Sequence, residues 1–239
     1  MTTWHEIRNT NEVNIHFSYL DLRDAEPTHV ESIFSPTEIS RANRLPAGRA
    51  RIRFTAGRLF LRETLAAYLD LKPGEILLHE GEWGKPYLVR EPGCRPLSFN
   101  LSHSADLALL AVSGGNELGA DMERVVERRH LVEMARLFFS RRELEELLSL
   151  PGDELLTAFY RCWTRKEAYM KGCGRGLSLP SGSFDVSLLP GLSPALLAHR
   201  LFPDEPERWS IIDIAAPEGF CAALAYEGGP LKIRYIPVH

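Results

Sequence analysis

The chain has 239 residues, of which 44% are hydrophobic and 25% are charged, a composition typical of globular proteins with ordinary cores. Its formal charge of −4 at pH 7 gives no reason to expect a nucleic acid as partner. No stretch approaches the roughly 20 apolar residues that span a membrane, and the first residues lack a signal-peptide pattern. Because the four cysteines also form no C-x-x-C pair, we expect a cytoplasmic protein without a membrane partner.

The first 70 residues predict one strand and two helices. Apolar residues at alternating positions from 13 to 19 indicate a half-buried strand. Ser35 and Glu38, with a proline directly after the serine, have the order of a helix start in which Ser is the N-cap and Glu reaches back to it. We expect a short helix to about Leu45 and, after a Pro-Ala-Gly interruption, a longer helix to about Leu69.

Positive charge gathers over these two helices. Seven arginines and no acidic residue lie between positions 41 and 62 of a chain that is acidic overall, which favours binding of an anion there. The alternative is that the arginine stems cover apolar surface while the guanidinium groups stay in water. We expect two or three of them to face a phosphate group. The seven are Arg41, Arg44, Arg49, Arg51, Arg53, Arg58 and Arg62.

The middle of the chain has strand character. The sequences Ile-Leu-Leu-His at 76–79 and Tyr-Leu-Val at 87–89 predict two short strands around the turn Gly84-Lys85-Pro86. A continuous apolar run at 107–112 predicts a buried strand, and the sequence Ser-Gly-Gly-Asn after it is typical of a hairpin turn. We therefore expect this run to pair with the strand that follows the turn.

Asp121 and Glu123 lie at the predicted end of that following strand. Strand side chains alternate between faces, so these two carboxylates point the same way. They repel each other unless a cation lies between them, and Mg²⁺ is typically bound by a few carboxylates together with phosphate oxygens of a substrate. The pair favours a magnesium site, but an Asp-x-Glu pair also fits a solvent-exposed strand end.

The second half begins with helices. Ser140 and Glu143 form another capping-box pattern, and a longer helix is predicted after the Pro-Gly-Asp sequence at 151–153. In that helix apolar residues recur at helical spacing, and Glu167 and Lys171 lie four residues apart, thus on one face. Taken alone, these two residues fit a solvent-facing ion pair worth a few tenths of a kcal/mol.

Strand patterns complete the chain. Alternating or continuous apolar residues predict strands near 183–189, 209–214, 220–226 and 231–236. A Gly-x-Gly-x-Gly run at 172–176 follows the long helix, whereas a dinucleotide-binding fingerprint follows a strand. We therefore expect no dinucleotide site at these glycines.

Four of these segments together resemble the signature of the 4′-phosphopantetheinyl transferases. Gly119-Ala-Asp-Met-Glu is similar to the family pattern Gly-x-Asp-x-Glu, and Trp163-Thr-Arg-Lys-Glu-Ala-Tyr-Met-Lys is similar to Trp/Phe-x-x-Lys-Glu-x-x-x-Lys. Gly84-Lys-Pro and Phe99-Asn-Leu-Ser-His-Ser resemble the family's Gly-Lys-Pro turn and its Phe-Asn-x-Ser-His-Ser segment. Their order and spacing agree with the long, Sfp-type branch, and the resemblance covers nearly the whole chain.

The resemblance implies an α+β fold: two similar α+β subdomains in a pseudo-twofold arrangement, with the cofactor in the cleft between them. Residues 1–115 would contact the nucleotide and phosphates of coenzyme A, and residues 116–239 would carry the magnesium and catalytic residues. Members of the short branch supply one half per chain and must trimerise. We therefore expect this longer chain to act as a monomer.

The implied activity moves 4′-phosphopantetheine from coenzyme A to a serine of an apo acyl or peptidyl carrier protein and releases adenosine 3′,5′-bisphosphate. The resemblance implies that Asp121, Glu123 and Glu167 hold Mg²⁺, or Mn²⁺ in its place. Glu167 is the first candidate for accepting the serine proton and Glu143 the second, and Lys171 would stabilise charge on the phosphates. The implied coenzyme A contacts are Arg41, Arg44, Arg53, Lys85, Ser102, His103, Lys166 and Lys171.

Two other classes of function remain open at this point. A magnesium-dependent nucleotide phosphohydrolase would use the same acidic residues but need no carrier protein. A non-catalytic coenzyme A-binding partner of a synthase would have no use for three metal ligands, so the intact acidic set disfavours it. The sequence leaves open which carrier proteins are modified and which arginines between 41 and 62 face the cofactor.

Overall fold

The structure is a computed structural model that describes residues 11–21, 27–88 and 97–237. The strands are β1 (Glu12–Tyr19), β2 (Leu78–Glu80), β3 (Pro86–Leu88), β4 (Ser98–Ser104), β5 (Leu107–Ser113), β6 (Leu118–Arg124), β7 (Phe184–Val186), β8 (Leu196–His199), β9 (Trp209–Asp213), β10 (Phe220–Glu227) and β11 (Lys232–Ile236). The helices are α2 (Pro27–Ile33), α3 (Pro36–Arg44), α4 (Arg49–Leu69), α5 (Leu131–Phe138), α6 (Arg141–Leu148), α7 (Gly152–Gly172) and α8 (Glu205–Arg208).

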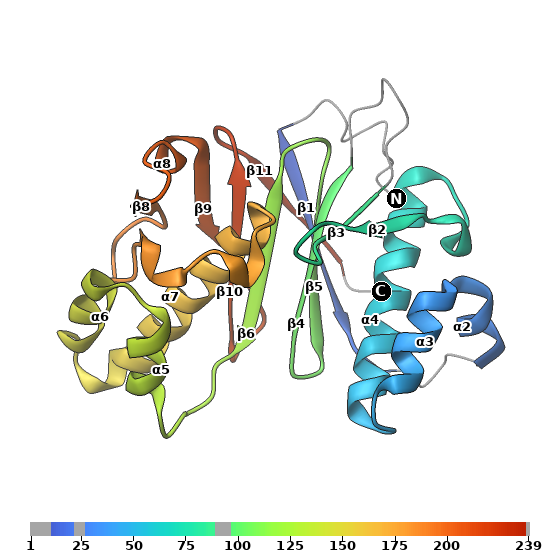
Figure 1. Cartoon of the computed structure of the whole chain (residues 1–239), viewed down its shortest axis with the longest axis horizontal. Helices are drawn as coiled ribbons and strands as arrows, with labels where there is room; N and C mark the ends of the chain where they lie inside the picture. The colour runs from blue at the N-terminus through green and yellow to red at the C-terminus, as the bar shows by residue number, and fades with distance from the viewer. Residues whose placement is uncertain (1–10, 22–26, 89–96, 238–239) are drawn as a thin grey trace.

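Two sheets stand side by side, each with its own group of helices (Figure 1). The first sheet has the strand order β11-β1-β5-β4 and the second the order β6-β10-β9, and two small ribbons pair β2 with β3 and β7 with β8. Helices α2 to α4 lie on the side of the first sheet, and α5 to α7 on the side of the second. The predicted α+β class is confirmed.

The first half forms for the reasons that the sequence indicates. Ser35 and Glu38 make the expected capping box at the start of α3, with Pro36 in the first turn. Leu61 and Leu65 of α4 pack against the even-numbered residues of β5, such as Leu110. Because strand side chains alternate, one face of β5 is left for a second core.

That second core joins the two halves. Leu109 and Ala111, on the other face of β5, share a buried cluster with Ala120 and Met122 of β6 and with Leu224 of β10. The strand β5 is therefore buried on both faces, which explains its continuous apolar sequence. The two sheets are held against each other by hydrophobic packing rather than by a shared backbone ladder.

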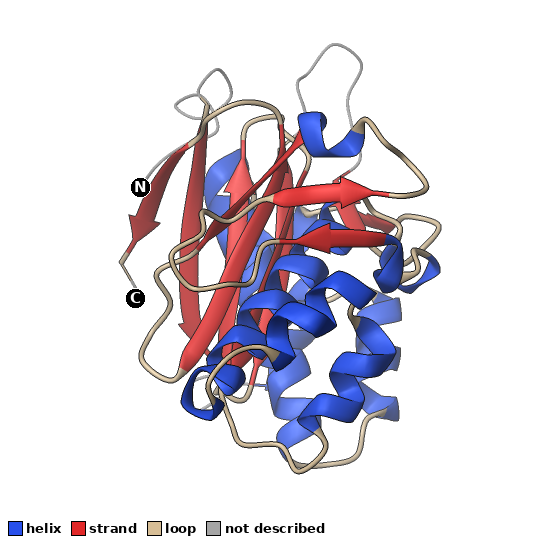
Figure 2. Cartoon of the chain, turned by 90° about the vertical axis from the view of Figure 1, so that its left-hand side faces the viewer, coloured by secondary structure: helices blue, strands red, loops and turns tan. Residues whose placement is uncertain are grey.

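In the second half, α7 packs across β6 and β10, and Figure 2 shows the helices of this half in front of the strands. Phe159 and Tyr169 of α7 lie in a core with Ala223 and Ala225 of β10. The helix comes so close to β6 that a Cβ added at Gly119 would lie 2.1 Å from the backbone nitrogen of α7's last residue. Only glycine fits this contact.

The seam between the halves runs between β4 and β6, which lie side by side in the middle of Figure 1. Their backbones do not pair, since β4 pairs with β5 and β6 pairs with β10. Alternate side chains of β4 instead accept hydrogen bonds from alternate amides of β6. These bonds run from Ala120 N to Asn100 Oδ1 at 2.9 Å, from Met122 N to Ser102 Oγ at 3.2 Å and from Arg124 N to Ser104 Oγ at 3.1 Å.

Two features of this topology differ from the sequence-based expectation. The predicted hairpin is wrong: β5 lies between β1 and β4, and the turn after it carries the chain across to the other sheet. An apolar run followed by a turn does not reveal that the partner strand belongs to a second sheet. The last strand, β11, was expected as a strand near 231–236, but it pairs in parallel with β1 of the first half.

Smaller elements complete the comparison. The helices α2 and α8 and the strands β4 and β8 have no counterpart among the predicted elements. The predicted strand at 87–89 corresponds to β3, and its last residue, Val89, lies outside the described residues.

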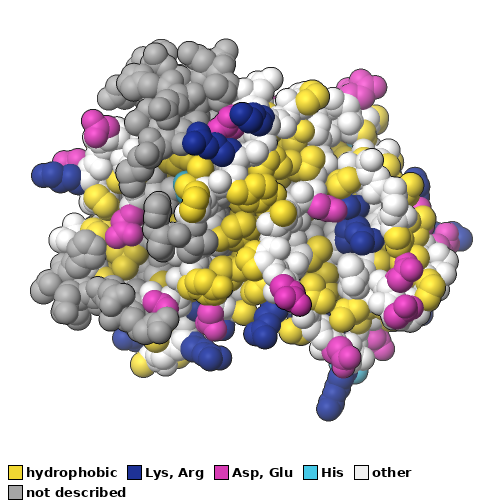
Figure 3. Space-filling view, turned by 180° about the vertical axis from the view of Figure 1, so that it is seen from behind, with side chains coloured by type: hydrophobic (Ala, Val, Ile, Leu, Met, Phe, Trp, Pro, Cys, Tyr) yellow, Lys and Arg dark blue, Asp and Glu magenta, His cyan; other side chains and the backbone are white. Residues whose placement is uncertain are grey.

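Two further observations concern the polarity of the helices and of one face of the molecule. Within the described ranges, every helix is too short or too polar to cross a membrane. Seen from behind, hydrophobic side chains gather along the middle of the described surface, and charged side chains of both signs are mixed around them (Figure 3).

Candidate active site

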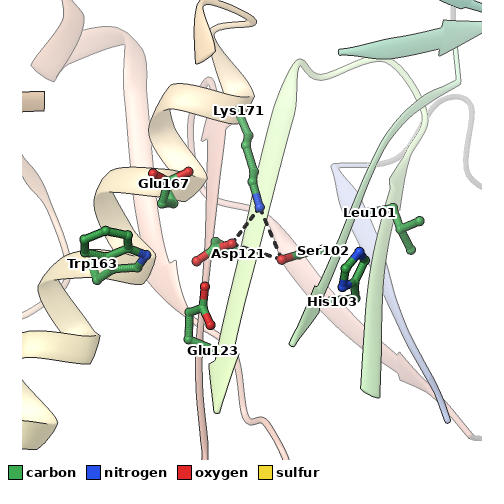
Figure 4. Close-up of a pocket in the computed structure, with 8 residues that line it drawn as sticks. All are labelled: Leu101, Ser102, His103, Asp121, Glu123, Trp163, Glu167 and Lys171. Carbon is green, nitrogen blue, oxygen red and sulfur yellow. Dashed lines mark hydrogen bonds and ion pairs between the residues drawn. The ribbon is translucent and has the colours of Figure 1, made fainter. Parts of the chain in front are cut away.

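A pocket of about 400 Å³ opens at the seam between the two halves (Figure 4). Strand β4 contributes Leu101, Ser102 and His103 from the first half. Strand β6 and helix α7 contribute the remaining side chains from the second half, and these are Asp121, Glu123, Trp163, Glu167 and Lys171. The structure thus brings together six residues that the sequence singled out from three separate segments.

Helical spacing explains how α7 serves this pocket. Trp163, Glu167 and Lys171 are four residues apart in turn, so they form one row on the helix face that looks towards β4 and β6. The opposite face carries buried side chains that fix the helix, among them Cys162 and Tyr169. Gly119 sets the distance between α7 and β6, because the helix backbone lies directly against the backbone of β6 at this residue.

Lys171 is the central cation of the pocket. Its Nζ lies 2.6 Å from Asp121 Oδ1 and 3.2 Å from Ser102 Oγ, and Ser102 donates a second hydrogen bond to the same Asp121 oxygen at 2.9 Å. Among the described residues, Lys171 makes its ion pair with Asp121 rather than with Glu167. The reading of Glu167 and Lys171 as a solvent-facing pair within the helix is therefore wrong.

Two carboxyl groups of the pocket, those of Glu123 and Glu167, have raised pKa values. Burial raises the pKa of the Glu167 carboxyl above its usual value, and the charge of Asp121 raises it further, while Lys171 acts in the opposite direction. Burial also raises the pKa of Glu123, against the lowering effect of its hydrogen bond from Ser104. Desolvation and mutual repulsion both penalise the ionised forms, so an added cation would be favoured here.

The donor set fits a hard cation such as Mg²⁺. Asp121 is 3% exposed, and its Oδ2 is buried without a hydrogen-bond partner among the described residues. Glu123 and Glu167 supply further carboxylate oxygens, the ligands that Mg²⁺ prefers. In the described part of the chain, no three such side chains stand close enough to enclose an ion as they are, so ligation would require side-chain rotation.

Two basic residues of the first half, His103 and Arg53, lie in or near the pocket. His103 lies beside Ser102, and burial followed by the charges of Lys171 and Arg53 lowers the pKa of its imidazole. Arg53 itself donates to Asp106 Oδ1 at 2.8 Å, in the turn that follows β4. Arg53 is therefore close enough to influence the pocket, although its side chain does not line it.

Arg41 and Arg44 lie further out, at the end of α3. The guanidinium of Arg41 lies over the ring of Phe54 at 5.4 Å and 3.7 Å from Glu80. Arg44 is an exposed residue in the last turn. Arg41 therefore covers an aromatic ring with its guanidinium, which also lies near a carboxylate.

Other arginines of the 41–62 segment serve the fold. Arg62 is 3% exposed and pairs with Glu38 at 2.8 Å, and Arg51 donates to the carbonyl of Leu45 at 2.8 Å. Some arginines of this segment thus make hydrogen bonds within the protein, and others lie on its surface.

Three remaining candidates lie outside the pocket. Lys85 donates to Glu117 Oε2 at 3.1 Å and to the carbonyl oxygen of Gly172 at 2.8 Å, so it links the β2–β3 turn to the end of α7. Lys166 and Glu143 form a buried ion pair at 2.7 Å, and Val186 N also donates to Glu143. Lys166 directly precedes Glu167 and so lies about 100° round the helix from it, and its ammonium points away from the seam pocket to Glu143.

Sequence reasoning assigned no site role to Trp163, Asn100 or Ser104. Trp163 was expected in the apolar stripe of α7, and it does stack with Phe159, yet it also lines the pocket. Its position four residues before Glu167 was the available signal. Asn100 and Ser104 lie two residues either side of Ser102, so strand alternation places all three on the seam.

Comparisons with known proteins agree along the chain. A family model described as "4'-phosphopantetheinyl transferase superfamily" matches residues 117–225, and one described as "4'-phosphopantetheinyl transferase, N-terminal" matches residues 24–114. The 4'-phosphopantetheinyl transferase HetI of Nostoc sp. is 35% identical over 219 residues, which cover 92% of this chain and 89% of that protein.

Two further relatives carry the same description. The 4'-phosphopantetheinyl transferase Sfp of Bacillus subtilis is 30% identical over 74% of this chain and 77% of its own length. The 4'-phosphopantetheinyl transferase AcpT of Escherichia coli is 40% identical over 54% of this chain and 61% of its own length. The comparisons support neither a nucleotide phosphohydrolase nor a non-catalytic partner. The chain therefore belongs to the 4′-phosphopantetheinyl transferase superfamily, as an enzyme of its long, Sfp-like type.

Proposed function

We propose that the seam pocket catalyses magnesium-dependent transfer of 4′-phosphopantetheine from coenzyme A to a serine of an apo carrier protein. One observation carries this proposal: three carboxylates and a lysine, drawn from β6 and α7, meet a Ser-His pair of β4 in a single pocket. Phosphoryl transfer needs little covalent help from a protein, because its main demands are positioning and neutralisation of charge. The pocket offers groups for both.

Asp121, Glu123 and Glu167 are the residues that would hold Mg²⁺, or Mn²⁺ in its place. The unpartnered, buried Oδ2 of Asp121 and the raised pKa of both glutamates support this assignment. When bound, the ion supplies a Lewis acid that polarises phosphate oxygens.

Lys171 and Glu167 would act on the reacting groups. The serine oxygen forms a bond to the phosphorus that bears the pantetheine arm, and the bond from that phosphorus to the oxygen of the leaving phosphate breaks. The serine proton passes to the Glu167 carboxylate, whose raised pKa suits a proton acceptor. The electron pair leaves with adenosine 3′,5′-bisphosphate, whose developing charge the ammonium of Lys171 stabilises.

Residues of the first half would bind the phosphates of coenzyme A. Ser102 and His103 line the pocket with Lys171, and Arg53 of α4 lies near them, where it donates to Asp106 in the turn after β4. Arg41, Arg44 and Lys85 are proposed only as outer contacts, since they lie beyond the pocket. The burial of the Lys166–Glu143 pair favours a structural role, so we give these two residues no part in the reaction.

We also propose that one chain suffices for activity. The pocket takes its Ser-His pair from the first half and its acidic residues from the second half of the same chain. A monomer therefore holds a complete set, and an apo acyl or peptidyl carrier protein is its partner.

Mass spectrometry of apo carrier proteins tests the proposal directly. Incubation with coenzyme A and Mg²⁺ should add the mass of phosphopantetheine to the carrier serine, and a metal chelator should prevent it. Coenzyme A alone is the second arm: release of adenosine 3′,5′-bisphosphate without a carrier protein would indicate a hydrolase instead. A carrier serine that stays unmodified across acyl and peptidyl carrier proteins would contradict the proposal.

A further inference from the structure

Two serines of β4 make the same pair of hydrogen bonds to β6. Ser102 accepts from Met122 N and donates to the carboxylate of Asp121 at 2.9 Å. Ser104 accepts from Arg124 N at 3.1 Å and donates to Glu123 Oε2 at 2.7 Å. Each serine thus binds one acidic side chain and the backbone amide of the residue after it.

This repeated unit explains why the seam uses side chains instead of a backbone ladder. A β ladder would satisfy the same amides of β6, but it would offer no donor to the carboxylates. A hydroxyl can accept from an amide and donate to a carboxylate at the same time. The seam therefore satisfies the edge of β6 and fixes two acidic side chains with the same residues.

The contact matters most for Glu123, whose side chain is longer than that of Asp121. The terminal torsion of a glutamate is broad, so an unheld carboxylate samples many orientations. Ser104 holds one of its oxygens from outside the pocket, because Ser104 is absent from the residues that line it. Residues that orient metal ligands in this way typically change metal affinity by 10–100-fold.

We propose that Ser104 is a positioning residue that orients the Glu123 carboxylate for metal binding. The inference rests on the metal role of Glu123 in the proposed function. The buried, unpartnered Oδ2 of Asp121 is an independent sign that a cation belongs between these strands. Ser102 makes the equivalent contact to Asp121, but it also touches Lys171 and lines the pocket. Ser104 is therefore the residue in which orientation can be tested apart from substrate contact.

Mn²⁺ titration followed by electron paramagnetic resonance, with coenzyme A present and no carrier protein, gives a readout independent of turnover. Ser104→Ala should weaken Mn²⁺ binding about 10-fold or more. Ser104→Thr keeps the hydroxyl and should bind within about twofold of the unchanged protein, on the same reasoning. Asn100→Ala is the matched control, since it removes a bond to the β6 backbone without touching a carboxylate. It should lower the melting temperature and leave Mn²⁺ affinity unchanged.

Two results would overturn the inference while leaving the proposed function in place. One is an unchanged Mn²⁺ affinity in Ser104→Ala. The other is an equal loss in Asn100→Ala, because the effect would then come from weakening of the seam. If the unchanged protein fails to bind Mn²⁺, the metal assignment of the proposed function fails first and the role of Ser104 falls with it.

Discussion

Substitution of Gly119 by alanine tests whether α7 is positioned by its contact with β6. The added Cβ would lie 2.1 Å from Gly172 N and 2.2 Å from the carbonyl oxygen of Ala168, and real Cβ contacts hardly ever fall below 3.0 Å. Both neighbours are backbone atoms that cannot rotate aside, so the helix must move away by about 1 Å. Forced overpacking of this kind costs ~1–3 kcal/mol of folding free energy, or roughly 2 to 4 °C in melting temperature per kcal/mol.

The same movement carries Glu167 and Lys171 away from Asp121. A misplacement of about 1 Å at reacting groups reduces turnover on the order of 10²-fold, so Gly119→Ala should lose far more activity than stability. Steady-state transfer to a carrier protein and thermal unfolding measure the two effects.

Gly152→Ala is the matched control for this experiment. Gly152 is the first residue of α7, and a Cβ added there meets nothing within 4 Å, so stability and rate should both stay near those of the unchanged protein. Transfer by Gly119→Ala at the unchanged rate would refute the idea that this glycine sets the geometry of the site.

Three further predictions concern the pocket itself. Glu167→Gln and Lys171→Met should each lower kcat by about two orders of magnitude, and only the first should also weaken Mg²⁺ in a metal titration; wild-type rates in both would remove α7 from the mechanism. Arg53→Ala and His103→Ala should raise KM for coenzyme A more than they lower kcat. Equal losses with dephospho-coenzyme A would show that neither residue contacts the 3′-phosphate. The raised pKa of Glu167 means that its ionised form destabilises the metal-free fold, so the contribution of this carboxyl to stability is highest below the ordinary pKa of 4.5 and declines as pH rises through the raised pKa. Glu167→Gln should therefore raise the melting temperature of metal-free protein more at pH 7 than at pH 4, and a gain independent of pH would contradict this cause.

Local chemistry made several elements predictable. The capping boxes at Ser35 and Ser140 are decided by residues three apart, and both are present as expected. The row Glu167–Lys171 follows from helical periodicity alone. What periodicity could not give is the partner of Lys171, because Asp121 comes from a strand fifty residues earlier.

Long-range pairing was the part that sequence reasoning could not reach. The continuous apolar run of β5 is buried between α4 and the second sheet. The sequence of the turn after β5 does not reveal either neighbour. The ion pair between Lys166 and Glu143 illustrates the same limit. A motif places Lys166 beside Glu167, but only the packing of α6 and β7 shows that its ammonium is already used inside the protein.

The pairing of β11 with β1 has a consequence for the way in which the chain is made. During synthesis, β1 emerges more than 200 residues before its parallel partner, β11. Until Lys232–Ile236 leave the ribosome, one edge of β1 stays without its partner strand, and an open strand edge is a template for pairing with other chains. The first half therefore cannot complete its sheet before β11 has been made. A chain cut before residue 232 should accordingly aggregate even though every residue of the pocket is present.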